Sequence, residues 1–100
     1  MSCTPGCPVE KTSRIIDGKW TLLIIRDLLS GKMRFSELQK SLAGVSPKVL
    51  SARLKFLENE GIVTRTLFPS VPPRTEYALT PLGKNLKQVI DALAQFGDRI

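Results

Sequence analysis

The sequence predicts a mainly α-helical domain that carries one small β-hairpin. Apolar residues recur at helical spacing over most of the chain, whereas a segment after Gly61 is rich in β-branched residues. Residue pairs such as Cys7–Pro8 and Ser46–Pro47 are typical helix starts. With 100 residues, of which 42% are hydrophobic, the chain has room for one core. We expect residues 1–7 to be a flexible arm and residues 8–100 to be the folded domain.

Start and stop signals divide the first 60 residues into four helices. The second is apolar on more than one face and should be the central, most buried helix. Ser36 and Ser46 should cap the third and the fourth, and Arg34–Phe35 is a short extended stretch. The expected helices run from Pro8 to Gly18, from Trp20 to Leu29, from Glu37 to Leu42 and from Pro47 to Gly61.

The rest of the chain predicts a hairpin and a final helix. Residues 62–68 and 75–79 should form two strands, with Pro69–Pro73 as the turn between them. Thr80–Pro81 then opens one last helix. Its apolar stripe is Leu82, Leu86, Val89, Ile90, Leu93 and Phe96. Two helices joined by a tight turn and followed by a hairpin make a winged helix-turn-helix.

The fourth helix has a polar face without acidic residues. Lys48, Ser51 and Lys55 lie opposite its leucine stripe, and no Asp or Glu occurs from Ser46 to Leu57. Such a face suits the major groove of DNA, although a solvated helix surface is the alternative. The net charge of +6 agrees with a polyanionic partner, and also with simple solubility. The candidate DNA contacts of this helix are Ser46, Pro47, Lys48, Ser51, Arg53 and Lys55.

Three residues outside this helix are further candidates for DNA contacts. Arg65 on the first strand and Arg74 beside the turn can meet flanking phosphates or the minor groove, unless the hairpin serves only solubility. Ser36 can bring a helix N-terminus and its hydroxyl to a phosphate, or be only a cap.

The apolar stripe of the last helix is longer than a domain of this size can bury in its own core. We expect part of its stripe to pack against a second copy of the chain, giving a dimer through the terminal helices. Packing within the chain's own core is the alternative. The candidate dimer residues are Ile15, Ile16, Leu86, Val89, Ile90, Leu93 and Phe96.

The composition argues against an enzyme, a cofactor and a metal site. The chain has no histidine, two cysteines cannot close a four-ligand zinc site, and no glycine-rich phosphate loop is present. Its longest apolar run, Leu22–Ile25, is too short for a signal peptide or a membrane span. We therefore expect a cytoplasmic protein with thiol cysteines and no membrane partner. A winged-helix module that binds a protein without operator DNA is the other function considered, but it should expose apolar anchors.

Several motifs together resemble the HxlR family of bacterial winged-helix regulators, which is MarR-like. They are Cys7-Pro8-Val9-Glu10, Gly18-Lys19-Trp20-Thr21, Arg34-Phe35-Ser36-Glu37-Leu38, Ser46-Pro47-Lys48-Val49-Leu50, Arg53-Leu54, Pro72-Pro73-Arg74, Glu76-Tyr77-Ala78-Leu79-Thr80 and Leu82-Gly83. The resemblance implies a cytoplasmic homodimer that binds a double-stranded operator through the helix beginning at Ser46, with wings on flanking DNA. It specifies neither the inducer nor the direction of regulation.

The resemblance also bears on Cys7, because some members of the family sense oxidants or electrophiles through a matching cysteine. At the cap position before Pro8, Cys7 would lie at the positive end of the first helix, where Lys11 favours the thiolate and Glu10 opposes it. An oxidised thiolate can be captured by a second thiol, and Cys3 is the candidate resolving partner, although it is not part of the family motif. An inert N-terminal cysteine is the alternative.

Overall fold

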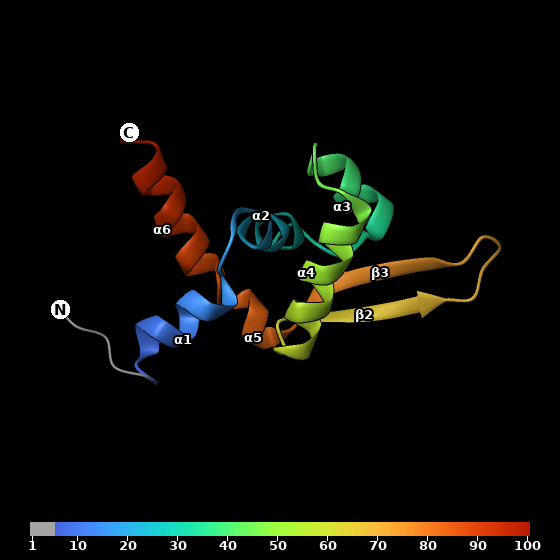
Figure 1. Ribbon diagram of the computed structural model, residues 1–100, viewed down its shortest axis with the longest axis horizontal. Helices are drawn as coiled ribbons and strands as arrows, with labels where there is room; N and C mark the ends of the chain where they lie inside the picture. Colours follow the sequence, from blue (N-terminus) through green and yellow to red (C-terminus); the bar gives the residue numbers. More distant parts are fainter. Residues whose placement is uncertain (1–5) are drawn as a thin grey trace.

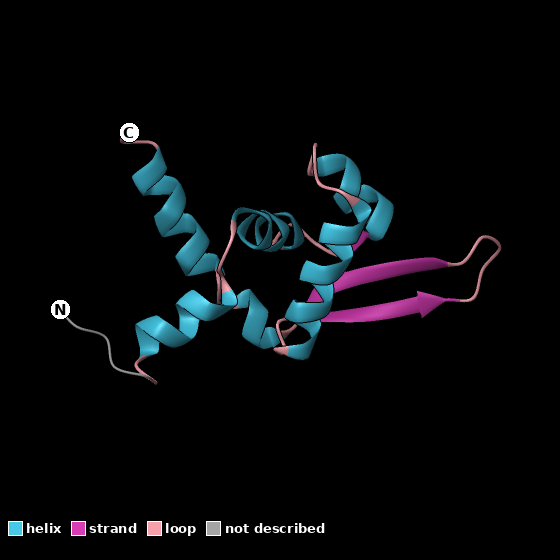
Figure 2. Cartoon of the chain, in the orientation of Figure 1, coloured by secondary structure: helices cyan, strands magenta, loops and turns pink. Residues whose placement is uncertain are grey.

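The computed structural model describes residues 6–100, so most of the predicted arm lies outside the described residues. Figures 1 and 2 show helices gathered around the base of a projecting hairpin. The elements are α1 (Pro8–Ile15), α2 (Lys19–Leu28), β1 (Met33–Arg34), α3 (Phe35–Ser41), α4 (Pro47–Asn59), β2 (Val63–Phe68), β3 (Arg74–Leu79), α5 (Pro81–Lys84) and α6 (Lys87–Gly97). This order confirms the predicted winged helix-turn-helix.

The three strands form one antiparallel sheet in the order β1-β3-β2. Tyr77 of β3 is the central position, since it pairs with Met33 of β1 on one side and with Arg65 of β2 on the other. The short β1 covers only the base of β3, so the β2–β3 hairpin projects from the domain as a wing (Figure 1). Through the pairing of β1 with β3, the sheet therefore connects the start of α3 to the wing.

The core lies where α2, α3 and α4 meet the base of the sheet. Ile24 and Ile25 of α2 and Leu38 of α3 are fully buried. The stripe of α4 that the sequence predicts, Leu50, Leu54 and Leu57, is buried as well. Since this stripe faces the core, the opposite side of α4 faces solvent.

Two helix starts follow the predicted chemistry, and one does not. Ser46 caps α4 by accepting the Val49 N–H at 3.1 Å, and Thr80 caps α5 by accepting the Gly83 N–H at 3.0 Å. The prediction that Ser36 caps the third helix is wrong, because α3 begins at Phe35, two residues before the predicted Glu37, and its N-cap is Arg34. The Glu37 carboxylate accepts the Arg34 N–H at 2.7 Å, so β1 passes directly into α3.

The single last helix predicted from the sequence is divided into α5 and α6. The N–H groups of Asn85 and Leu86 donate to carbonyls three residues back, which tightens the turn between the two helices. Gly83 docks so closely on the backbone just before β2 that a Cβ there would collide with the Ile62 carbonyl oxygen, and the Thr80 hydroxyl donates to the Gly61 carbonyl at 2.6 Å. This docking fixes α5 against the sheet, and α6 then diverges from it (Figure 1).

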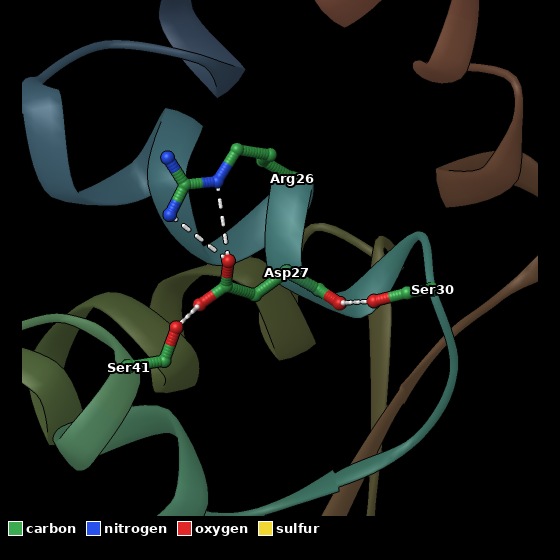
Figure 3. A network of polar contacts seen from close by, with 4 residues as sticks. All are labelled: Arg26, Asp27, Ser30 and Ser41. Atoms are coloured by element: carbon green, nitrogen blue, oxygen red, sulfur yellow. Dashed lines mark hydrogen bonds and ion pairs between the residues drawn. The ribbon is translucent and has the colours of Figure 1, made fainter.

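A polar network joins the C-terminal ends of α2 and α3. The Asp27 carboxylate accepts one bond from the Ser41 hydroxyl at 2.6 Å and two from the Arg26 guanidinium at 3.0 and 3.1 Å (Figure 3). The Ser30 hydroxyl donates to the Asp27 carbonyl oxygen at 2.7 Å and closes the end of α2. These contacts fix the orientation of α3 relative to α2. Because α4 follows α3 in the chain, they also help to position α4.

We expect Gly83→Ala to destabilise the domain by about 1–3 kcal/mol, because the new Cβ must displace the Ile62 backbone just before β2. The matched control is Gly97→Ala in α6, where a Cβ meets nothing within 4 Å. That substitution should raise stability by about 0.5–1 kcal/mol, since alanine favours the helix over glycine. Urea unfolding measures both, and equal stability of Gly83→Ala and wild type would contradict the close docking of α5.

Candidate nucleic-acid interface

The outer face of α4 carries the basic residues that the sequence singles out. Lys48, Ser51 and Lys55 are all exposed, as is Ala52 between them. Ser46 and Pro47, at the start of the helix, are exposed too. The structure thus brings the predicted contacts of α4 onto one solvent-facing surface, which we call the α4 face.

Arg53 lies at the border of the α4 face. Its guanidinium carbon is 5.8 Å from the centre of the Phe56 ring, and the residue is partly buried. The side chain therefore packs along the helix and extends the basic surface toward one flank.

The wing extends the α4 face through Arg65. Ser51 and Lys55 line a hollow of about 270 Å³ together with Glu58, Arg65 of β2 and Tyr77 of β3. Arg65 is exposed, whereas Tyr77 is buried beneath it. Helix α4 and the first strand of the wing therefore meet in one hollow, whose charged lining residues are Lys55, Glu58 and Arg65.

Tyr77 is a member of this hollow that is not predicted from the sequence. Burial raises the pKa of its phenol, and the positive charge of Arg65 and a hydrogen bond from it act in the opposite direction. The nearby Glu58 carboxylate adds to the rise. Tyr77 thus holds the Arg65 side chain by a hydrogen bond. Its place in the hollow follows from the strand register, which pairs Tyr77 with Arg65 and which residue spacing alone does not give.

Arg74 and Ser36 lie in a different place from Arg65. Both line a larger hollow, of about 570 Å³, between the start of α3 and the turn of the wing. The Arg74 guanidinium stacks on the Phe68 ring at 4.6 Å. Its Nε lies 3.3 Å from Glu76 Oε2 as an ion pair, without a hydrogen bond of good geometry. Five of the predicted DNA contacts therefore divide between two hollows, and the other four, Ser46, Pro47, Lys48 and Arg53, line neither.

A second surface, formed by α1 and α6, is apolar. Ile15, Ile16, Leu86 and Ile90 are half-buried against the core, and Val89 is half-buried too. Leu93 and Phe96 are 46% and 64% exposed. Two exposed residues that the prediction leaves out, Val9 of α1 and Leu82 of α5, enlarge this apolar surface. Figure 1 shows α1 and α6 on the side of the domain away from the wing.

Cys7 occupies the predicted cap of α1, where its sulfur accepts the Glu10 N–H at 3.4 Å. A thiol is expected from the sequence, but in this structure Cys7 is disulfide-bonded. Cys3, the candidate resolving partner, lies outside the described residues.

Neither a metal centre nor a membrane span is found in the part of the chain that the structure describes. Residues 6–100 contain no group of three or more His, Cys, Asp or Glu side chains that could hold a metal ion. Within the same range, every helix is too short or too polar to cross a bilayer.

The profile of the HxlR-like helix-turn-helix family matches residues 15–100. The chain belongs to this family. YvaP of Bacillus subtilis, named an HTH-type transcriptional regulator, is 43% identical over 97 residues, which cover 96% of this chain and 90% of YvaP. YtfH of Escherichia coli K12, named in the same way, is 39% identical over 90 residues, or 90% of this chain and 71% of YtfH. The protein is therefore a transcriptional regulator of the helix-turn-helix type, not an enzyme.

Solved structures agree with this assignment. A MarR-family regulator from Porphyromonas gingivalis W83 superposes with a TM-score of 0.92 at 43% identity and covers 97% of this chain and 95% of its own. The reduced form of the redox regulator HypR gives a TM-score of 0.88 at 33% identity, with 93% and 92% coverage. Diamide-treated YodB from B. subtilis gives 0.77 at 33% identity, with 97% of both chains covered.

Tyr77 is the only tyrosine of the chain, so its absorbance reports on the hollow under Arg65. We expect its phenol to titrate above the ordinary pKa of 10.0, and Arg65→Ala to raise that pKa further by removing the positive charge. Because the folded state then keeps its proton to higher pH than the unfolded state, stability should fall as the pH rises above 10.0 through the folded pKa. A pKa at or below 10.0, or one lowered by Arg65→Ala, would contradict this geometry.

Proposed function

We propose that the protein regulates transcription by binding specific double-stranded DNA with the α4 face in the major groove. The observation that carries this proposal is that Lys48, Ser51 and Lys55 share an exposed face of α4 that has no acidic residue before Glu58, and that the opposite side of the helix is locked in the core. Lysines supply phosphate contacts and contacts to guanine, and a serine hydroxyl can bond a base edge. Arg65 lies beside this face and can meet the adjoining backbone.

A module that binds only protein is the competing function. It would need exposed apolar anchors on the α4 face. Val49 is the one large apolar residue of α4 with substantial exposure, at 39%, whereas the α4 face itself carries Lys48, Ser51 and Lys55. The composition of the face therefore favours DNA.

We expect Lys48→Ala and Lys55→Ala to weaken binding to DNA that the pure protein selects from genomic fragments. Each should also lower the slope of log affinity against log salt by about one for each phosphate that the variant no longer neutralises. Ser51→Ala should change sequence preference more than the salt slope. Lys11→Ala, which replaces an exposed lysine on α1, is the matched control and should bind as wild type. Fluorescence anisotropy at several salt concentrations measures the DNA affinity of all four variants. If the three α4 variants bind DNA as the wild type does, the α4 face is not the DNA-binding surface.

We further propose that the protein acts as a twofold homodimer joined through α1 and α6. The support is the exposed apolar surface of these helices, including Leu93 and Phe96 at the distal part of α6. A twofold dimer places two copies of α4 in successive major grooves, with half-sites about 10 base pairs apart. A second copy would also cover the hollow of about 250 Å³ beside α5, which Ile15, Leu82 and Val89 help to line.

We expect Leu93→Glu to convert the dimer into a monomer, because it places a charge in the apolar contact. Leu67→Glu on the wing is the matched control, since Leu67 is a similarly exposed leucine (56% against 46%) on the other side of the domain. Light scattering measures the mass, and circular dichroism verifies that both variants are folded. A wild-type monomer at micromolar concentration, or a dimer of Leu93→Glu, would defeat the proposed interface.

We also propose that Cys7 makes DNA binding sensitive to oxidants. Its sulfur caps α1, so a change in its bonding state acts directly on a helix of the proposed dimer surface. The similarity to HypR, a redox regulator, and to YodB, which was solved in a diamide-treated form, supports the proposal. Diamide would join the Cys7 thiol to a second thiol as a disulfide and take up the two electrons and two protons released.

We expect diamide to release the reduced protein from its operator, or to change its mode of binding, and a dithiol reductant to reverse the effect. Cys7→Ser should not respond, whereas Cys3→Ser distinguishes capture by Cys3 from capture by another thiol. Gel mobility shift and mass spectrometry follow DNA binding and the disulfide in the same samples. An equal response of Cys7→Ser, or no response of the wild type, would leave Cys7 with a structural role only.

A further inference from the structure

We propose that the hollow between α3 and the turn of the wing holds a backbone phosphate of DNA, and that Arg34 is the residue that contacts it. The inference rests on the proposed function, because the phosphate belongs to the duplex bound by the α4 face. It adds a contact residue, and it joins Ser36 and Arg74, predicted as separate contacts, in one site.

The hollow has two walls that come from distant parts of the sequence. Arg34, Phe35 and Ser36 form one wall at the end of β1 and the start of α3, and residues 70–75 form the other at the turn of the wing. Pairing of Arg34 with Glu76 across β1 and β3 brings the walls together. The volume of the hollow is about 570 Å³.

The charges around the hollow are arranged to receive an anion. Arg34 and Arg74 line opposite walls, and no acidic residue is among the lining residues. Two carboxylates lie close to the hollow and both are engaged: Glu76 by Arg74 at 3.3 Å and by Lys32 at 3.8 Å, and Glu37 by the Arg34 backbone N–H at 2.7 Å. Arg34 is exposed, and among residues 6–100 no carboxylate lies within ion-pair distance of its guanidinium. One guanidinium is thus held in place while the other is available to a ligand.

The donors in the hollow match a phosphate group. A guanidinium presents a planar set of N–H donors that fits phosphate oxygens in a bidentate manner. The exposed Ser36 hydroxyl adds a donor on the same wall as Arg34. The Ser70 hydroxyl, by contrast, already donates to the Pro72 carbonyl at 2.7 Å and helps to shape the turn. The site is therefore built mainly from Arg34, Arg74 and Ser36.

The position of the hollow indicates DNA backbone as the source of the phosphate. The wing projects on the side of the domain away from α1 and α6 (Figure 1). A duplex that receives α4 in its major groove extends past the protein on both sides of that contact, so its flanking phosphates can reach the hollow beside the wing. The phosphates nearest to Arg34 would then belong to the DNA backbone that flanks the base pairs contacted by α4.

The first test compares Arg34→Ala with Lys32→Ala, its matched control on the preceding segment. We expect Arg34→Ala to weaken operator binding about tenfold and to reduce the salt slope by about one. Arg34→Lys should keep the slope but recover only part of the affinity, since lysine lacks the bidentate geometry. Lys32, whose ammonium group pairs with Glu76, should change affinity less than about twofold when replaced by alanine.

The second test replaces single operator phosphates by neutral methylphosphonates. With wild type, one flanking position in each half-site should weaken binding, and with Arg34→Ala the same position should have no further effect. Two results would overturn the phosphate contact. One is that Arg34→Ala binds more weakly but keeps the wild-type dependence of affinity on salt. The other is that the methylphosphonate weakens binding by Arg34→Ala as much as it weakens binding by the wild type. Wild-type binding by Arg34→Ala while Lys48→Ala is impaired would overturn this inference alone. Failure of the wild type to bind any selected DNA would overturn the proposed function with it.

Discussion

The burial of Leu50, Leu54 and Leu57 in α4 is the constraint on which the rest of the structure depends. Each leucine side chain removed from water contributes about 1.5–3 kcal/mol, so rotating α4 about its axis would cost much of the stability of a small domain. The helix can therefore present only one face outward, the one with Lys48, Ser51 and Lys55. The hydrophobic core thus selects the residues that α4 presents to solvent, and with them the proposed DNA contacts.

The docking of α5 plays a similar part for the opposite end of the domain. Gly83 and Thr80 fix α5 on the backbone of Gly61 and Ile62, and the tightened turn after it directs α6 away from the sheet. Leu93 and Phe96 consequently lie outside the core and are exposed to solvent. One chain thus carries a basic face near the wing and an apolar face on the far side, as a dimeric DNA-binding protein requires.

Local signals in the sequence predict the parts of the fold that local chemistry decides. The Ser46 cap, the leucine spacing of α4 and the switch to β-branched residues after Gly61 are of this kind, and all three are confirmed. The start of α3 is mispredicted because Ser36 is a good cap by type, while the bond from the Arg34 N–H to Glu37 decides otherwise. The division of the last helix, the hydrogen bond between Tyr77 and Arg65, and the hollow at Arg34 depend on tertiary packing or strand register, which residue spacing does not reveal.

The central claim is that two copies of α4 occupy successive major grooves of one operator. Protection of guanine N7 from methylation tests it most directly, because this atom lies in the major groove. The account predicts two protected clusters related by a twofold axis and separated by about 10 base pairs. A single protected cluster, or a bound complex in which every guanine N7 stays reactive, would contradict it.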